Sequence, residues 1–196
     1  MYRLFLAAVD MLPAALILIP VFLLLNRTVF HNFRKCILYY VFACYLSVVY
    51  VLVGLPNVTY IRAELNLNLI PFAGILADWK NSILNVLLFV PLGIMLPLLW
   101  SNFNNPLKTV LFGFAMSLAI ELLQILTFRA TDINDLITNT LGTYIGYLAS
   151  TVFRRKYPIP GENKSIELCI VIVTVLITMF FAYPFVSAAL WDLILT

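Results

Sequence analysis

Seven strongly polar or charged side chains occur within residues 121–140 of a chain that is otherwise mostly apolar. They are Glu121, Gln124, Arg129, Asp132, Asn134, Asp135 and Asn139. Carboxylates at this density can act as general acids or bases, bind a cation, or orient an arginine toward an anionic ligand. Each use requires neighbouring helices to bring the side chains together, because an ionisable group in the membrane costs roughly 2.5–3.5 kcal/mol.

Glu121 and Asp135 are the candidates for acid–base catalysis without histidine. His31 is the single histidine of the chain and lies in a loop predicted on the opposite side of the membrane. A Ser/His triad or a Cys/His pair is therefore excluded. The oxygen donors of the cluster suit Ca²⁺ or Mg²⁺, but they show no compact spacing motif. The sequence predicts no metal site and no cofactor.

The elements that must position these residues are membrane-spanning helices. The chain has 196 residues, of which 63% are hydrophobic and 11% charged, whereas soluble domains carry about 25% charged residues. Long continuous apolar runs predict helices and exclude a β-barrel with alternating strands. The predicted segments cover residues 4–25, 36–56, 82–100, 107–127, 136–153 and 166–190. The first segment carries Asp10, Pro13 and Pro20 and no small-residue cleavage site, so we interpret it as a retained helix.

The predicted fold is all-α: a polytopic transmembrane bundle of about six helices, forming a single domain over residues 1–196. The apolar stretch 66–72 favours a re-entrant or interfacial loop near residues 60–80. Placing loops 26–35, 101–106 and 154–165 in the cytoplasm puts eight of the twelve Lys and Arg residues on that side, seven of them in these loops and Lys108 at the start of the fourth segment. The net charge of +3 therefore reflects membrane orientation and does not indicate a nucleic-acid partner.

Helical spacing predicts that three segments share a polar site in the outer half of the membrane. One face of the fifth segment and its start carries Asp132, Asp135, Asn139, Gly142 and Gly146. The fourth segment presents Ser117, Glu121 and Gln124. The third presents Asn85, Phe89 and Gly93. The three glycines would let the helices approach closely at the floor of an outward-opening pocket.

Structural interpretations compete with this pocket. Asp132 followed by Asp135 also matches the N-cap and first turn of a helix. Asn85 could cap a helix or bond across helices, and Gly142 with Gly146 is a common packing pattern. A buried Glu121–Arg129 ion pair could be purely structural.

The segments "NLIPF" (68–72), "NVLLFVPLGIMLPLL" (85–99), "SLAIELLQ" (117–124) and "RATDINDLITNTLGTYIGY" (129–147) occur in this order. Together they resemble the VanZ-like membrane family, over about residues 68–147. The resemblance implies ligand-binding positions at Asn68, Asn85, Glu121, Gln124, Arg129, Asp132, Asp135 and Asn139. The family usually has glycine where this chain has Phe128. Its members are mainly bacterial, and its namesake is associated with resistance to teicoplanin-type glycopeptide antibiotics.

Three functions follow as hypotheses. The first is a non-enzymatic membrane protein of a Gram-positive plasma membrane. Its outward pocket would bind a lipid headgroup, a lipid-linked cell-wall precursor or the antibiotic, with Arg129 holding an anionic group. The second is an intramembrane enzyme that modifies a lipid or wall intermediate through Glu121 or Asp135. In the third, the polar cluster only fixes helix packing.

Overall fold

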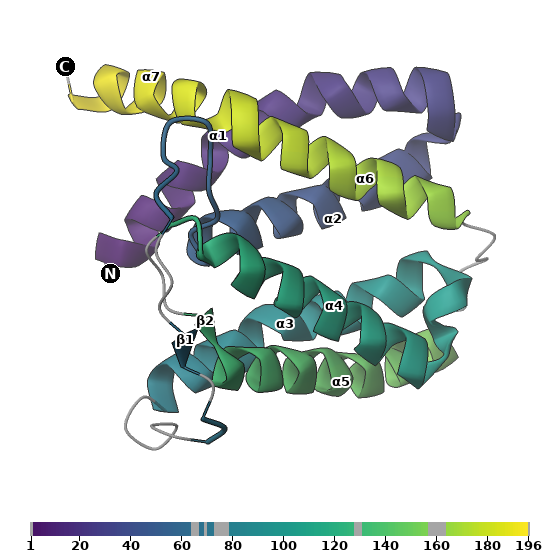
Figure 1. The fold of residues 1–196 in the computed structure, drawn as a ribbon. Coiled ribbons are helices and arrows are strands. Elements are labelled where there is room, and N and C mark those ends of the chain that lie inside the picture. The colour runs from purple at the N-terminus through teal and green to yellow at the C-terminus, as the bar shows by residue number, and fades with distance from the viewer. Residues whose placement is uncertain are drawn as a thin grey trace. The chain divides into compact units, whose positions relative to one another are not determined.

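A computed structural model describes residues 2–63, 67–68, 70–72, 79–127, 131–156 and 164–195 (Figure 1). Its elements, in chain order, are α1 (Tyr2–Leu25), the π-helical turn η1 (Asn26–Phe30), α2 (Phe33–Leu52), β1 (Leu67–Asn68), α3 (Trp79–Leu99), the 3₁₀ turn η2 (Ser101–Asn104), α4 (Pro106–Gln124), β2 (Thr131–Asp132), α5 (Ile133–Lys156), α6 (Ser165–Ile177), the π-helical turn η3 (Thr178–Ala182) and α7 (Tyr183–Leu195). The predicted helical membrane bundle is confirmed, since each predicted segment coincides with a helix or, at the C-terminus, with continuous α6, η3 and α7.

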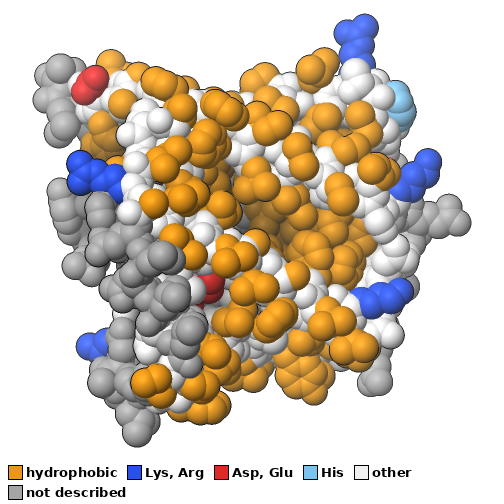
Figure 2. Space-filling model, in the orientation of Figure 1, with side chains coloured by type: hydrophobic (Ala, Val, Ile, Leu, Met, Phe, Trp, Pro, Cys, Tyr) orange, Lys and Arg blue, Asp and Glu red, His pale blue; other side chains and the backbone are white. Residues whose placement is uncertain are grey.

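Five of the described helical stretches are long and apolar enough to cross a membrane. Hydrophobic side chains cover most of the face seen in Figure 2, while the Lys and Arg side chains visible there lie toward the edges, where the helices end. The helix α5 is not among these five stretches. It carries Asn134, Asp135, Thr138 and Asn139 in its first two turns. The least apolar helix is therefore the one that holds much of the predicted polar cluster.

The chain divides into two compact units. Unit 1 comprises Met1–Ile61 and Ile166–Thr196, and unit 2 comprises Arg62–Ser165. The predicted single domain over residues 1–196 stays a prediction. All described members of the polar cluster belong to unit 2.

Local sequence explains where α2, a helix of unit 1, begins and ends. The side chain of Asn32 accepts a hydrogen bond from the Lys35 amide and caps α2. At the other end, Gly54 adopts φ 65°. The Gly54 amide bonds to the Val51 carbonyl and the next amide to Tyr50, as in a glycine-terminated helix.

Pro184 interrupts the last membrane-spanning stretch at η3 and α7. Proline has no N–H, so the carbonyl four residues earlier, that of Phe180, lacks its usual helical donor. The amide of Val58 supplies this donor at 3.1 Å. The helix can therefore bend inside the membrane without leaving that carbonyl unsatisfied.

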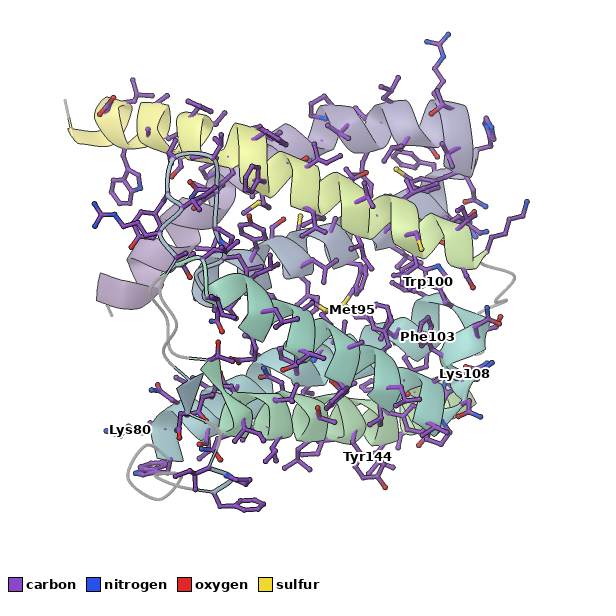
Figure 3. The ribbon with its side chains drawn as sticks, in the orientation of Figure 1. Lys80, Met95, Trp100, Phe103, Lys108 and Tyr144 are labelled. Carbon is purple, nitrogen blue, oxygen red and sulfur yellow. The ribbon has the colours of Figure 1, made fainter. Side chains whose placement is uncertain are left out.

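In unit 2, α5 lies along both α3 and α4 (Figure 1). Asn105 caps α4 by accepting from the Leu107 amide, and Pro106 occupies the first turn, where its missing N–H costs nothing. Figure 3 shows Lys80 at one end of this unit and Trp100, Phe103 and Lys108 at the opposite end. The polar cluster lies at the Lys80 end, where α4 stops and α5 starts.

A short parallel ladder was not predicted from the sequence. Leu67 pairs with Thr131 and Asn68 with Asp132, so β1 and β2 join the loop before α3 to the connection between α4 and α5. The predicted re-entrant or interfacial loop falls partly on residues 64–66, 69 and 73–78, outside the described residues. Its depth in the membrane stays a prediction.

Candidate functional site

The helices α3 and α5 pack closely against each other, and this contact brings their polar residues together. A Cβ atom on Gly93 would overlap the backbone of Thr143 and Tyr147. On α5, a Cβ on Gly142 or Gly146 would overlap backbone atoms of α3, including the Val90 carbonyl at Gly146. Side chains at these positions would push the helices apart. The predicted role of these glycines in close helix approach is thus confirmed.

Glu121 is 2% exposed and lies in the last turn of α4. The apolar run in the sequence predicts an end of this helix near residue 127, but the helix ends at Gln124. The amides of Leu126 and Thr127 bond to carbonyls three residues earlier, which tightens the chain into turns. Glu121 therefore lies about 4.5 Å from the helix end, nearer to it than predicted.

A backbone donor holds the Glu121 carboxylate. The amide of Asp132 donates to Glu121 Oε2 at 2.9 Å. The hydroxyl of Thr131 also donates to the backbone carbonyl of Glu121 at 3.1 Å. Both contacts come from β2, so Glu121 fixes the strand that precedes α5.

Asp132 connects three elements through its two carboxylate oxygens. Oδ1 accepts from the Asn134 amide at 2.8 Å, which caps α5. Oδ2 accepts from Nδ2 of Asn68 on β1 at 3.0 Å. The N-cap interpretation of Asp132 is therefore confirmed, and the same side chain also holds the loop of β1.

Asn134 makes a second tie to that loop. Its Oδ1 accepts from the Phe72 amide at 2.7 Å. Phe72 has φ 62°, a left-handed conformation that is unfavourable for a bulky residue. The hydrogen bond to buried Asn134 helps to hold this conformation. Asn134 was part of the polar cluster in the sequence but not among the predicted ligand-binding residues. Its signal was the spacing of two residues from Asp132, typical of an Asx turn.

Asn85 and Asp135 join α3 to α5. Nδ2 of Asn85 donates to Oδ1 of Asp135 at 2.7 Å. Asp135 also lies in the first turn of α5, where the helix dipole favours a negative charge. The interhelical role considered for Asn85 is thus confirmed, and both residues lie at the same end of unit 2 as Glu121.

One turn further into α5, Asn139 faces α4. Its Nδ2 donates to Oγ of Ser117 at 2.9 Å, and both residues are buried. Within the described part of the chain, Oδ1 of Asn139 is buried and accepts no hydrogen bond. Gln124 is also buried, on the same helix as Ser117. The predicted polar face of α4 therefore does point into unit 2.

The structure thus brings most of the predicted site residues to one end of unit 2. Hydrogen bonds link Glu121 with Asp132 and Asn68, Asn85 with Asp135, and Asn139 with Ser117. Arg129 and Phe128 lie outside the described residues, so the predicted Glu121–Arg129 pair stays a prediction. Among the described side chains, no three His, Cys, Asp or Glu residues are grouped as metal ligands would be.

The sequence model of the VanZ/LLP1 family matches residues 36–154, which is more than half of the chain. The chain belongs to the VanZ/LLP1 family. The matched range contains every predicted site residue from Asn68 to Asn139 and runs through parts of both units. Lys35 and Glu167, which meet in unit 1, lie outside it.

A curated relative is Protein VanZ of Enterococcus faecium. It is 37% identical over 82 residues, which are 41% of this chain and 50% of that protein. The chain therefore matches about half the length of this relative. No solved structure matches the chain. Family membership and the apolar helices make this chain a multi-pass membrane protein of a bacterial family.

Proposed function

We propose that this protein contributes to glycopeptide resistance by binding an envelope ligand at the polar end of unit 2. The ligand would be a lipid headgroup, a lipid-linked wall precursor or the lipoglycopeptide itself. The observation that carries the proposal is the buried Glu121 carboxylate, which holds β2 through the Asp132 amide. A buried carboxylate at this helix end is costly, and a protein that needed only helix packing would be more stable without it.

The linked hydrogen bonds supply a preorganised polar surface. Asp132 holds Asn68, and Asp135 holds Asn85, so side chains from a loop and two helices are fixed before a ligand arrives. Fixed donors and acceptors reduce the entropy that binding must overcome. In this proposal Arg129 pairs with an anionic group of the ligand, and Gln124 and Asn139 complete the site.

The charge distribution of unit 2 favours an outward site. Lys108 lies near the start of α4, and Glu121 lies near the end of the same helix (Figure 3 labels Lys108). Arg154, near the end of α5, bonds to Asn104 of η2 at the Lys108 end. By the preference of Lys and Arg for cytoplasmic loops, the Glu121 end faces the cell exterior. Glycopeptides and wall precursors are found on that side.

Binding is favoured over catalysis by the way the two candidate bases are used. Oε2 of Glu121 accepts a hydrogen bond from the backbone amide of Asp132, and Oδ1 of Asp135 accepts one from the side-chain amide of Asn85. Both carboxylates therefore serve as fixed acceptors in the described structure. This use fits residues that position neighbouring groups.

The test is teicoplanin susceptibility of cells that express the full chain, its Glu121→Gln variant or its Arg129→Ala variant at matched membrane levels. We expect both variants to lose protection. Glu167→Gln, a matched carboxylate change in unit 1, should keep it. If the chain protects and both site variants protect equally well, the polar end of unit 2 has no part in resistance.

A binding measurement separates the site from its effect in cells. Purified protein in phosphatidylcholine nanodiscs is titrated with teicoplanin, with Asn85→Ala as a further site variant. Saturable binding that weakens in the variants supports the proposal. Equal binding to empty nanodiscs and to protein would contradict direct recognition of the antibiotic.

A further inference from the structure

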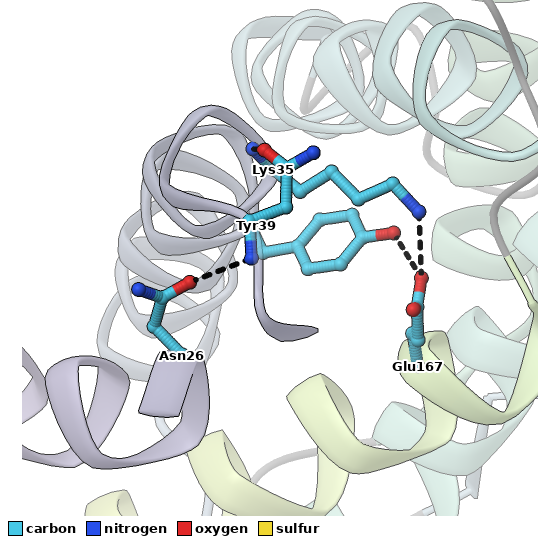
Figure 4. Close-up of polar contacts among 5 residues, drawn as sticks. Asn26, Lys35, Tyr39 and Glu167 are labelled. Atoms are coloured by element: carbon cyan, nitrogen blue, oxygen red, sulfur yellow. Dashed lines mark hydrogen bonds and ion pairs between the residues drawn. The ribbon is translucent and has the colours of Figure 1, made fainter. Parts of the chain in front are cut away.

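A second buried carboxylate lies in unit 1, on elements that take no part in the proposed site. Glu167, in the first turn of α6, is 7% exposed. The hydroxyl of Tyr39 donates to its Oε2 at 2.6 Å, and Lys35 Nζ lies 3.8 Å from the same oxygen (Figure 4). Lys35 and Tyr39 are one helical turn apart on α2, so both point to Glu167 from the same face.

This arrangement positions Lys35 without using up its hydrogen bonds. The distance of 3.8 Å is longer than the roughly 2.7–3.2 Å of a direct hydrogen bond. Tyr39 already occupies the carboxylate oxygen that faces Lys35. An ammonium group has three N–H donors, and the Lys35 side chain is 29% exposed. Lys35 can therefore donate to a group that arrives from outside the protein.

Two further cations lie near Lys35 in the sequence: Arg27 in η1, and Arg34, the residue before Lys35, in the first turn of α2. Arg27 and Arg34 are exposed. Oδ1 of Asn26 accepts from the Asn32 amide at 3.1 Å, and Asn32 in turn caps α2. Residues 24–38 contain no Asp or Glu. Three cations thus accompany one buried carboxylate, and the loop end of unit 1 carries a net positive charge.

The helix surface next to these cations is apolar. Leu24 near the end of α1, and Phe33 and Ile37 on α2, are large exposed hydrophobic residues. Both helices are long and apolar enough to cross the membrane. A molecule that fits this surface has an anionic head at the loop and acyl chains along the helices.

We propose that Arg27, Arg34 and Lys35 form a binding site for the phosphate of an anionic phospholipid, with Glu167 and Tyr39 positioning Lys35. The ligand is a lipid of the leaflet on the cation-rich side, predicted to be cytoplasmic. A mere orientation signal needs exposed cations only. Such a signal does not need the Glu167 carboxylate and the Tyr39 phenol, on two different helices, to fix the position of Lys35.

The test compares lipid binding by the full-length protein and by variants with equal charge. Protein in mild detergent is titrated with phosphatidylglycerol or phosphatidylcholine and followed by native mass spectrometry. We expect preferential binding of phosphatidylglycerol, weakened on the order of tenfold in the double variant Arg34→Gln/Lys35→Gln. The control Lys80→Gln/Lys108→Gln removes the same charge from unit 2 and should bind as the unchanged protein does.

Further arms identify the ligand and guard against misfolding. The variant Arg34→Lys/Lys35→Arg keeps both charges and should keep the preference. Inorganic phosphate at the concentration of the lipid should not displace the bound phosphatidylglycerol, because free phosphate lacks acyl chains. The proposal is overturned if Arg34→Gln/Lys35→Gln and Lys80→Gln/Lys108→Gln lose the lipid equally, if Arg34→Gln/Lys35→Gln binds normally, or if free phosphate competes as well as the lipid.

Discussion

Glu121 and Glu167 are both buried glutamates within one turn of a helix end, but the ends are opposite in polarity. Glu167 lies at the start of α6, where the helix dipole stabilises a negative charge, and it accepts a hydrogen bond from the Tyr39 hydroxyl. Glu121 lies at the end of α4, where the dipole opposes a negative charge, and is held by a backbone amide. The position of Glu167 is therefore favourable for stability, and that of Glu121 is not. A carboxylate retained in an unfavourable place is the better candidate for function.

The largest effect should come from breaking the helix contact that supports the Glu121 end. Gly146→Leu would place a side chain against the Val90 carbonyl and Gly93 of α3, so we expect a loss of about 3 kcal/mol or more of unfolding free energy. Denaturant titration in micelles measures it. The neighbouring Ile145 is exposed, and Ile145→Leu is the control. A folded Gly146→Leu protein of normal stability would mean that the helices need not approach so closely.

The Glu167 side of the comparison is tested by charge removal. Glu167→Gln should lower the unfolding free energy by about 1–2 kcal/mol, because the dipole attraction, the Lys35 ion pair and part of the Tyr39 bond are lost. Tyr39→Phe should cost about 1 kcal/mol. In the double variant the two losses should not add, because the residues share one bond. Additive losses would show that the two side chains act independently.

An exchange of partners tests the loop held at the Glu121 end. Asn68→Asp places two carboxylates face to face, at positions 68 and 132, and should cost about 1 kcal/mol in a partly exposed setting. Adding Asp132→Asn should restore most of this loss, since an asparagine still caps α5 and its amide can donate to the carboxylate introduced at position 68. Thermal unfolding of the single and double variants gives the comparison. Absence of recovery would mean that the Asn68–Asp132 bond does not hold the loop.

The smallest stability effect should come from Glu121→Gln. The amide oxygen can still accept from the Asp132 amide, and the charge that opposes the helix dipole is gone. We expect a change within about 0.5 kcal/mol, together with loss of antibiotic protection. Unfolding and susceptibility are measured on the same preparations. If Glu121→Gln destabilises as much as Glu167→Gln, the two glutamates are alike and the functional argument for Glu121 fails.

The fold followed from composition and segment length because the membrane leaves few alternatives for an apolar chain. Backbone groups in lipid must bond within their own helix, so each long apolar run predicts one helix. The helix ends were harder to predict. The apolar run of α4 continues to Thr127, yet short turns and the Arg62–Leu126 backbone bond end the helix at Gln124.

The sequence by itself determined that this protein spans the membrane several times, and it predicted that polar residues of three helices share a depth, since spacing along a helix sets both face and height. Only the tertiary structure decided how these residues are used. Asp132 both caps α5 and holds Asn68, a residue 64 positions away in the chain, and Glu121 bonds to a backbone amide. The pairing of Glu167 with Tyr39, 128 residues apart, also had no local signal. Such partners are chosen by the packing of whole helices, which no spacing within one segment specifies.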